Sequence, residues 1–351
     1  MSAVLLGIGT ATPETVLEQG DAARIAGALM RIDGRRARAL RALYANTGVE
    51  ERRTLAAEGG GSAFFDDSHE RGPTTGERMA RYAALAPEMG EGAARAALAK
   101  SGVLPGAVTH LVTVSCTGFC APGVDVELIV RLGLSDRVQR THVGFMGCHG
   151  AINGLRVAAA IAGSDADAVV LVCCVELCSL HFQYQPTGGG ATANALFGDG
   201  AAACVVAGCG DGAALRRFGS VLMPDSADAM GWVIGDHGFE MSLSAGVPGL
   251  LEERVGGWVD AWLGESGMAR ADVGGWAVHP GGPRIVEAVR VSLGLEGSAV
   301  ADSLEVLRTL GNMSSPTVLF VIERMLAGGV GTPLVGLAFG PGLGGEAVLI
   351  G

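Results

Sequence analysis

The sequence predicts an α/β protein made of two similar halves. Strand patterns alternate with helix patterns along most of the chain, and the order of the patterns in the first half recurs in the second. At 351 residues the chain is long enough for two halves, and 49% apolar with 17% charged residues is typical of a globular protein with a large core. From the alternation we expect helices covering a mostly parallel sheet.

The repeat is visible first around two predicted strands. Residues 100–115, KSGVLPGAVTHLVTVS, and residues 265–280, ESGMARADVGGWAVHP, each indicate a helix end, a short loop and a strand. Each is followed by an amphipathic helix that closes on Gly-Leu, at 123–134 and 283–295. The two halves therefore share a local order of elements and not only a composition.

Later segments of the repeat align residues that carry chemistry. FMGCHGAINGLRVAAAI at 145–161 corresponds to TLGNMSSPTVLFVIERM at 309–325, so Gly-Cys in one copy stands where Gly-Asn stands in the other. Glycine-rich turns and closing strands follow at 196–208 and 338–351. The apolar run at 167–177 is expected to be a central, buried strand.

A pseudo-twofold axis between the halves brings equivalent helix starts to one place. We place the halves at residues 1–210, which carry Cys148, and 211–351, which carry His279 and Asn312. Cys148 precedes a helix that is apolar nearly all round, and His279 ends a strand just before Pro-Gly-Gly. We therefore expect these three side chains to meet in one central cavity.

A cysteine, a histidine and an asparagine suit thioester chemistry. A thiol is a good nucleophile only as thiolate, and a helix N-terminus or a nearby imidazolium lowers its pKa. His279 and the neutral amide of Asn312 can both donate to an oxyanion. The set therefore suits acyl transfer to sulfur, followed by stabilisation of the enolate that forms when a malonyl thioester loses CO2.

Each of these residues also has a simpler interpretation. A cysteine between glycines is often a small packed residue, a strand-end histidine can bond the backbone, and asparagine is a favoured helix cap. Their joint placement by the repeat favours the catalytic interpretation. His149, beside Cys148, is interpreted as a packing residue.

Composition argues against some classes of binding partner. A net charge of -11 without a Lys/Arg cluster argues against nucleic acid and anionic membranes, and no apolar stretch reaches the roughly 18 to 20 residues of a membrane span. The first residues show neither a basic flank nor a cleavage pattern, so we expect a cytoplasmic protein. The eight cysteines lack repeated CxxC spacing, which argues against a disulfide scaffold and a metal site.

Five motifs resemble the type III polyketide synthases, the chalcone synthase superfamily with the thiolase fold. The motifs are MGCHGAINGLRVA, LFGDGAAA, VHPGGPRIVEAV, GNMSSPTVLFVIERM and FGPGLGGEAVLIG. The resemblance covers essentially the whole chain and implies a duplicated, five-layered αβαβα architecture with two mixed sheets. It also implies a homodimer that needs no cofactor, with an acyl-CoA starter and malonyl-CoA as substrates.

The resemblance assigns roles to the three central residues. It implies that Cys148 takes the starter acyl group and that His279 and Asn312 hold the malonyl-derived enolate. Repeated condensation and cyclisation then yield a pyrone, resorcinol or naphthalene-type product.

The resemblance also implies which residues shape the cavity. Phe197 matches a gatekeeper phenylalanine, Met241 replaces the second gatekeeper of plant members, and Phe239 stands where those members often carry leucine. Cys116, Cys178 and His181 replace plant threonines that line the cavity, and we interpret the two cysteines as wall residues. Ser314, Gly281 and Gly282 are the further cavity candidates. Core packing for Phe197 and Met241, and helix capping for Ser314, stay open as alternatives.

Three arginines are candidates for the CoA phosphates. Arg38 and Arg41 are nearest to the basic cluster that plant members carry on an early helix, although they are out of register with it, and Arg284 follows HPGGP. A guanidinium suits phosphate, but an arginine-rich helix face is usually a solvated surface. Delivery of the starter by an acyl carrier protein therefore stays open.

Two other functions are weighed against this one. The ketoacyl-ACP synthase that starts fatty-acid synthesis shares the fold and the three catalytic residue types, but performs a single condensation, and HPGGP and NMSSP favour the polyketide enzyme. A catalytically inactive scaffold is disfavoured because all three residue types are present.

Overall fold

The computed structural model describes residues 3–55, 64–66, 70–187 and 189–351. The strands are β1 (Val4–Ala11), β2 (Val16–Glu18), β3 (Glu51–Arg53), β4 (His110–Ser115), β5 (Gln139–Gly144), β6 (Val169–Leu177), β7 (Asp199–Ala207), β8 (Ala213–Leu222), β9 (Met230–Gly235), β10 (Gly238–Leu243), β11 (Gly275–Val278), β12 (Leu334–Gly340) and β13 (Gly344–Ile350). The α-helices are α1 (Gln19–Leu29), α2 (Gly34–Ala45), α3 (Thr75–Ser101), α4 (Val124–Leu132), α5 (Gly150–Ser164), α6 (Gly190–Leu196), α7 (Val247–Gly264), α8 (Pro283–Leu293), α9 (Ala301–Leu310) and α10 (Thr317–Ala327).

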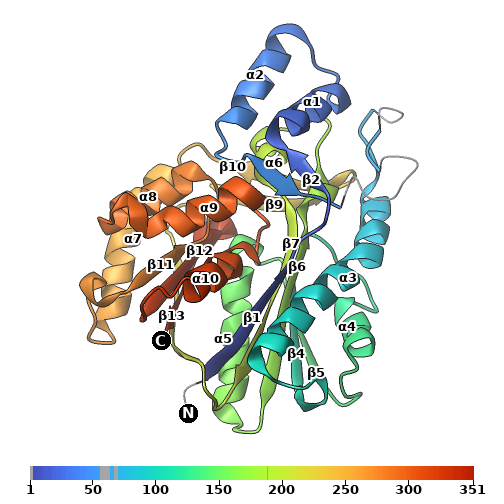
Figure 1. Ribbon diagram of the computed structural model, residues 1–351. Coiled ribbons are helices and arrows are strands. Elements are labelled where there is room, and N and C mark those ends of the chain that lie inside the picture. The colour runs from blue at the N-terminus through green and yellow to red at the C-terminus, as the bar shows by residue number, and fades with distance from the viewer. Residues whose placement is uncertain (1–2, 56–63, 67–69, 188) are drawn as a thin grey trace.

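Three layers of helices alternate with two layers of strands (Figure 1). Strands β5-β4-β6-β7-β1 form the first sheet, and β8-β13-β12-β11 form the second. Helices α5 and α10 lie between the sheets, where their apolar side chains join one core. Helices α3 and α4 cover the outer face of the first sheet, and α7 and α8 cover that of the second. This arrangement confirms the expected duplicated αβαβα architecture.

The strand order shows the repeat directly. The order β1-β7-β6-β4 in the first half corresponds to β8-β13-β12-β11 in the second, with α3, α4 and α5 matched by α7, α8 and α10. The two halves join where β1 pairs with β8 over Val4↔Ala214 and Leu5↔Ala213. Hydrogen bonding therefore runs on from one sheet into the other through this short contact.

Strand direction differs from the mostly parallel sheet expected from the alternation of elements. β4 is parallel to β5 and β6, and β11 is parallel to β12, but β7 and β13 run antiparallel to their neighbours. Between β12 and β13 the chain makes only the short turn Pro341–Leu343, which can reverse the chain but cannot cross over to a parallel position. The sheets are mixed, and β6 is the buried central strand of the first half, as predicted.

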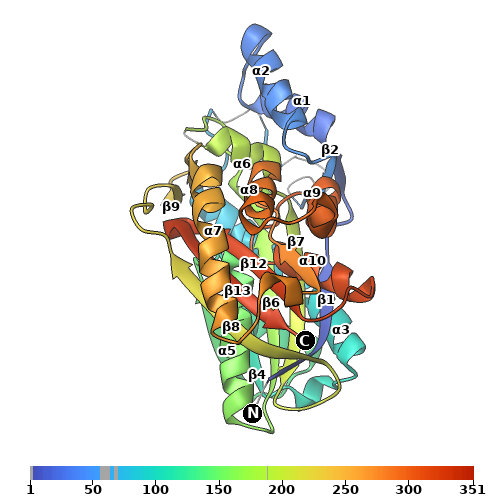
Figure 2. The same cartoon turned by 90° about the vertical axis from the view of Figure 1, so that its left-hand side faces the viewer.

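Helices α1, α2 and α6 with strands β2 and β3 form a cap at one end of the two sheets (Figures 1 and 2). Small side chains of α1 pack on Leu40 and Tyr44 of α2. Gln19, the first residue of α1, links α1 to the end of α2 and to α6. Its side-chain NH2 donates to Tyr44 O, Thr47 Oγ1 and Ala195 O. The cap thus holds the end of α6 beside the cavity described below.

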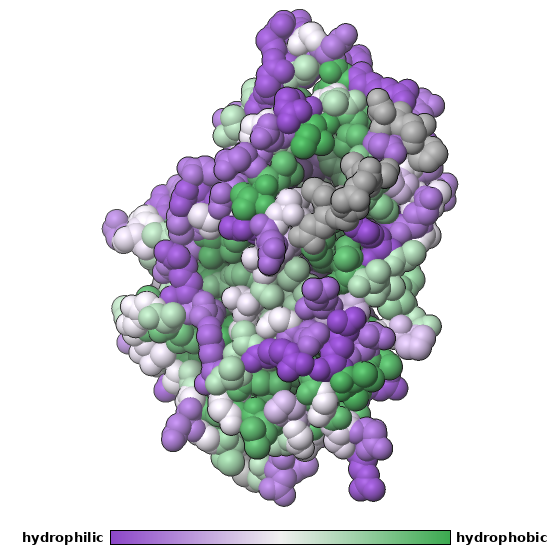
Figure 3. Space-filling model, turned by 45° about the vertical axis from the view of Figure 1, so that its right-hand side comes forward, coloured by the Kyte–Doolittle hydropathy of each residue, from purple (hydrophilic) through white to green (hydrophobic). Residues whose placement is uncertain are grey.

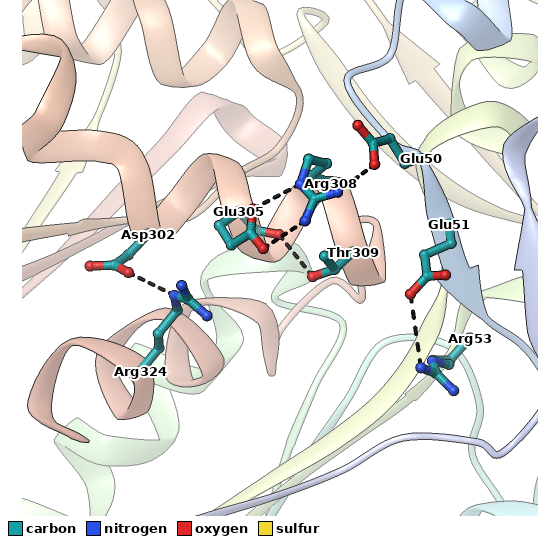
Figure 4. A network of polar contacts seen from close by, with 8 residues as sticks. All are labelled: Glu50, Glu51, Arg53, Asp302, Glu305, Arg308, Thr309 and Arg324. Atoms are coloured by element: carbon teal, nitrogen blue, oxygen red, sulfur yellow. Dashed lines mark hydrogen bonds and ion pairs between the residues drawn. The ribbon is translucent and has the colours of Figure 1, made fainter. Parts of the chain in front are cut away.

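Polar contacts fasten the second half to the segment that carries β3 (Figure 4). Arg308 of α9 pairs with Glu305 and with Glu50, and the backbone N–H of Glu50 donates to Arg308 O at 2.8 Å. Ion pairs at a protein surface each contribute up to about 1 kcal/mol, so the backbone bond supplies the more specific link. Because α9 ends at Leu310, these contacts hold the chain just before Asn312.

Two general properties bear on function. Within the described ranges, no helix is both long and apolar enough to cross a membrane. All eight cysteines lie in those ranges and are free thiols, which agrees with the absence of paired spacing in the sequence.

Candidate active site

Cys148 lies in the turn Gly147–His149, directly before α5. Gly147 has φ +75° there, and a Cβ at this position would lie 2.4 Å from Cδ of Pro341, so glycine is required on both grounds. The thiol is buried, with 7% of Cys148 exposed. The structure therefore places Cys148 at the start of a buried helix.

Asn312 reaches this thiol from the second half, with Nδ2 4.0 Å from Cys148 Sγ. The backbone of Asn312 is anchored to the first half, because its N–H donates to Leu196 O and its carbonyl accepts from Gly198 N, both at 2.9 Å. The side-chain Oδ1 accepts from Ser314 N at 2.8 Å. This bond directs the NH2 group of Asn312 toward the sulfur. The Oδ1 atom of the Asn312 amide thus accepts from the backbone, while its Nδ2 atom faces Cys148.

His279 follows β11 and is 1% exposed. Among the described residues, neither ring nitrogen has a hydrogen-bond partner. Burial, together with the nearby His149, lowers the pKa of His279 to about 3, so the ring is neutral in the free protein. A buried nitrogen without a partner is unfavourable, and a ligand oxygen in the adjoining cavity can relieve this.

One small cavity brings the three side chains together, because Cys148, His279 and Asn312 all line it. Phe197, Met241 and Gly281 line the same cavity, whereas Gly282, which directly precedes α8 and has φ +149°, does not line it. Burial raises the pKa of the Cys148 thiol to about 11, while hydrogen bonds from Ser314 and Asn312 act in the opposite direction. Thiol and imidazole are therefore both neutral before substrate enters.

Glu176, the last residue but one of β6, was missed in the sequence-based assignment of site residues. Its carboxyl group is fully buried and accepts from Ser315 Oγ at 2.5 Å, Thr117 Oγ1 at 2.7 Å and Cys116 N at 3.0 Å. Burial raises its pKa, while these hydrogen bonds lower it. The sequence contains one cue, a lone glutamate inside the apolar run that forms the central strand.

Cys116 and Ser314 connect this carboxyl group to Cys148. Cys116 Sγ lies 3.2 Å from Ser314 Oγ and 3.4 Å from Glu176 Oε1. Burial and the Glu176 carboxylate raise the pKa values of Cys116 and Cys178 well above the usual range, which opposes thiolate formation at either residue. Both cysteines lie in the wall of a second, larger cavity that is described below.

His181 is held as a structural part of that wall. Its Nδ1 accepts from Phe239 N at 3.0 Å, so Nε2 carries the proton and donates to Thr117 O at 2.6 Å. Its ring stacks on Phe239, with 4.1 Å between centroids, and meets Trp232 edge-on. Trp232, a second residue that sequence reasoning missed, donates from Nε1 to Cys116 O at 2.7 Å. This aromatic wall is rigid because each polar atom is bonded to backbone.

The larger cavity has a volume of about 230 Å3 and also opens onto Cys148. Seven of the residues expected to shape the substrate site line it together with Cys148. They are Phe197, Cys116, Cys178, His181, Phe239, Met241 and Ser314.

The three arginines expected at CoA lie elsewhere. Arg38 and Arg41 are exposed on α2, and Arg284 is exposed in the first turn of α8. None of the three is among the described residues that line the two cavities. The start of α8 does lie beside the segment that follows α2, since a Cβ on Gly48 would lie 3.6 Å from Pro283.

Comparison with known proteins agrees with this architecture. The family model for the N-terminal domain of chalcone and stilbene synthases matches residues 1–210, and the model for their C-terminal domain matches residues 215–351. The 3,5-dihydroxyphenylacetyl-CoA synthase of Streptomyces toyocaensis is 32% identical over 99% of this chain and 89% of its own. An alpha-pyrone synthesis polyketide synthase-like protein of Mycobacterium tuberculosis is 33% identical over 99% and 90%.

Solved structures give the same result. The polyketide synthase PKS-I of the brown alga Ectocarpus siliculosus superposes with a TM-score of 0.93 at 30% identity, over 99% of this chain and 98% of its own. The class defined by the fold is that of the thiolase-like condensing enzymes, which are acyltransferases. Within it, the chain belongs to the chalcone and stilbene synthase family and is a type III polyketide synthase.

Proposed function

We propose that Cys148 takes an acyl starter from CoA and that this acyl group is extended by decarboxylative condensation with malonyl-CoA. The observation that supports this most directly is the shared cavity of Cys148, His279 and Asn312, with two buried nitrogens on His279 that have no hydrogen-bond partner in the described part of the chain. CoA thioesters are the substrates, and the chemistry needs no further cofactor.

The loading step begins with proton transfer from Cys148 to His279. Burial disfavours either charge alone, but transfer between two neighbouring neutral groups leaves the net charge of the cavity unchanged. The thiolate attacks the starter carbonyl, the tetrahedral oxyanion accepts from the N–H groups of His279 and Asn312, and CoA leaves as a thiol after taking the proton back.

The extension step uses the same donors on a different oxygen. Malonyl-CoA loses CO2, and the electron pair of the broken C–C bond becomes an enolate whose oxygen accepts from Asn312 Nδ2 and from His279. The enolate carbon attacks the carbonyl carbon of the acyl group on Cys148, and the Cys148 sulfur leaves as a thiolate. Residues 1–210 thus supply the nucleophile, and residues 211–351 supply both oxyanion donors.

The products in the names of the relatives are cyclic, which supports a cyclised product here. Relatives of this chain include synthases of 3,5-dihydroxyphenylacetyl-CoA and of 1,3,6,8-tetrahydroxynaphthalene, the latter from Streptomyces peucetius and 36% identical over 78% of this chain. We propose a pyrone, a resorcinol or a naphthalene-type product here. Phe197 and Met241 line both cavities and are proposed as the gate between them.

Substrate entry is proposed from the side where the segment after α2 lies against the start of α8. Arg38 and Arg41 on α2 and Arg284 on α8 are exposed and suit the phosphates of CoA. An acyl carrier protein is the alternative donor of the starter at the same entrance. The protein is proposed to act in the cytoplasm, where both donors are made.

A homodimer is proposed through the free edge of the first sheet. Strand β5 is the last strand of the pairing order and is largely exposed. Phe119, Phe145 and Met146, which lie beside it in the chain or in space, are 50%, 40% and 37% exposed, and the rings of Phe119 and Phe145 are 6.0 Å apart. An exposed strand edge next to apolar side chains favours pairing with a second copy.

The test is incubation of the purified protein with malonyl-CoA and a panel of acyl-CoAs, with CO2 release and product mass as readouts. Several extensions followed by cyclisation support the proposal. A single condensation on malonyl-ACP would indicate the ketoacyl-ACP synthase activity instead. No turnover with any donor would indicate a scaffold.

A further inference from the structure

A chain of polar side chains runs along one face of α5 and begins beside Cys148. His149, Asn153 and Arg156 follow one another at i, i+4 and i+7, so they lie on the same face of the helix. Opposite this face lies Glu346 of β13. Figure 3 shows hydrophilic side chains on the surface of the molecule, whereas the Glu346 residue is only 5% exposed. A buried carboxyl group is costly unless other groups pair with it.

Glu346 accepts three hydrogen bonds. Its Oε1 accepts from Asn153 Nδ2 at 3.1 Å and from Ser220 Oγ at 2.9 Å, and its Oε2 accepts from Arg156 Nη2. The Arg156 side chain is partly exposed, so this ion pair lies at the solvent end of the chain. A carboxylate can only accept hydrogen bonds, so the NH2 group of Asn153 must face Glu346 and its Oδ1 must face the other way.

Asn153 thereby fixes the protonation of the His149 ring. Asn153 Oδ1 lies 2.8 Å from His149 Nδ1, and because this oxygen accepts, Nδ1 carries the proton. Burial and the Arg156 charge lower the pKa of His149, while the bond to Asn153 raises it, so the ring is neutral. After burial, His149 is the second cause that lowers the pKa of His279, so a charged His149 would oppose proton transfer from Cys148 to His279.

The turn between β12 and β13 encloses the His149 ring. A Cβ on Gly340 would lie 2.6 Å from Cδ2 of this ring. Pro341, the next residue, is the group that a Cβ on Gly147 would meet, and it lines the larger cavity together with Cys148. The residues on both sides of Cys148 are thus in contact with one turn of the second half.

We propose that Asn153 and Glu346 are positioning residues for Cys148. They act through His149, because their hydrogen bonds fix the orientation of its ring, and the ring fixes the turn that carries the sulfur. This inference rests on the proposed function and deepens it, since it states how the sulfur is held opposite the oxyanion donors. Glu346 lies in the second half, so the half that supplies these donors also sets the position of the sulfur relative to them.

The experiment follows acylation of Cys148 by hexanoyl-CoA in single turnovers of the full chain. Asn153→Leu and Glu346→Met keep the side chains near their original size and remove the hydrogen bonds between them. Each is expected to lower the acylation rate at saturating hexanoyl-CoA by about tenfold or more, because a misplacement of about 1 Å can cost about a hundredfold. The half-saturating concentration should change little, since neither residue is among the described residues that line the two cavities. Parent-like rates in both variants would overturn the proposal.

Two further variants separate positioning from a general loss of stability. Glu346→Gln keeps an oxygen that can accept from Asn153 and Ser220, so it should retain most of the acylation rate. The double variant Asn153→Leu/Glu346→Met should have a higher urea midpoint than either single variant, because neither the amide nor the carboxyl group is left buried without the other. Its acylation should nevertheless stay slow. Recovery of the rate together with the midpoint, or equal rates in Glu346→Gln and Glu346→Met, would overturn the proposal.

Ala162→Val is the matched control on the same helix. Ala162 is fully buried in the last turn of α5, where added methyl groups lower the urea midpoint by overpacking. Because Ala162 lies at the opposite end of α5 from Cys148, the acylation rate should stay at the parent value. A loss of rate equal to that of Asn153→Leu would show that any destabilisation of α5 has this effect, which would contradict the proposal.

Failure of the positioning role and failure of the proposed function give different results. If no acyl-CoA labels Cys148 in the parent protein, the proposed function is wrong. Alkylation of Cys148 by iodoacetamide, located by peptide mapping, needs no acyl substrate and then still decides the positioning role. Slower alkylation in Asn153→Leu and Glu346→Met than in the parent protein and Ala162→Val supports this role, and equal alkylation rejects it.

Discussion

The side-chain amide of Asn312 lies 4.0 Å from the sulfur of Cys148, across the junction between the two halves of the protein. Its oxygen is occupied by the N–H of Ser314, so only the NH2 group faces the thiol. In the sequence alone Asn312 could be interpreted as a helix cap, but in the structure its NH2 group is a fixed hydrogen-bond donor that faces the cavity. The geometry suits an oxygen held between the Asn312 amide and the Cys148 sulfur.

Replacement of Asn312 by alanine is expected to separate the two half-reactions. Decarboxylation of malonyl-CoA should fall about a hundredfold or more, because one donor to the enolate oxygen is lost. Acylation of Cys148, followed by intact-protein mass, should fall much less, since His279 still takes the thiol proton and, as a cation, still donates to the tetrahedral oxyanion of this step. Loss of acylation with decarboxylation preserved would reverse the assigned role.

Substitution of the proposed nucleophile gives an all-or-none result. Cys148→Ala should abolish both condensation and acyl labelling of the protein. Cys178→Ala, a change in the same cavity wall, should retain labelling, because burial keeps the Cys178 thiol protonated. Peptide mapping locates the acyl group, and normal labelling of another cysteine in Cys148→Ala would rule out the assignment.

The buried histidines predict a loss of stability in acid. Burial lowers the pKa values of His279 and His181 to about 3, whereas an unfolded histidine titrates near 6.5. The unfolded state therefore binds more protons between these values, and the free energy of unfolding falls as the pH drops from about 6.5 toward 3, by up to about 1.4 kcal/mol per pH unit for each histidine.

Urea denaturation across this pH range measures the effect. His279→Gln should make the dependence less steep by about one proton, because glutamine does not titrate. An identical slope in His279→Gln and the parent protein would show that His279 titrates normally in the folded state.

Arg52 is expected to stabilise the end of α6 next to Phe197. Arg52→Met leaves three buried carbonyls without their guanidinium partner, so the free energy of unfolding should fall by roughly 2–4 kcal/mol. Arg53→Met, at the next position but half-buried, is the matched control and should cost less than about 1 kcal/mol. Equal midpoints in urea for the two variants would contradict this prediction.

Trp232 is expected to limit the size of the product. Trp232→Ala removes most of one face of the aromatic wall and opens space beside Cys116 and His181. With one starter held constant, the mass spectrum of the products should shift toward additional malonyl-derived units. Trp258, on the outer helix α7, offers a control tryptophan away from the cavity, and Trp258→Ala should leave the product pattern unchanged.

Much of the architecture could be predicted from the sequence because it depends on local patterns of apolar and polar residues. Helix and strand periodicity, repeated in the two halves, predicted the paired layers and the buried β6. Strand direction was predicted less well, since it depends on how a connection such as Pro341–Leu343 folds back. Glu176 and Trp232 were missed because their importance comes from neighbours that are distant in the chain.

The sequence by itself determined the two-half α/β architecture, the family and the placement of Cys148 and Asn312 at equivalent points of a repeat. These follow from periodicity and motif, which are properties of short segments. Only the tertiary structure decided that the Asn312 amide faces the sulfur, that both His279 nitrogens are buried with no hydrogen-bond partner among the residues that the structure describes, and that the cavity continues along α1. Those properties depend on side chains from separate elements packing around one space, and no local pattern specifies which atoms meet there.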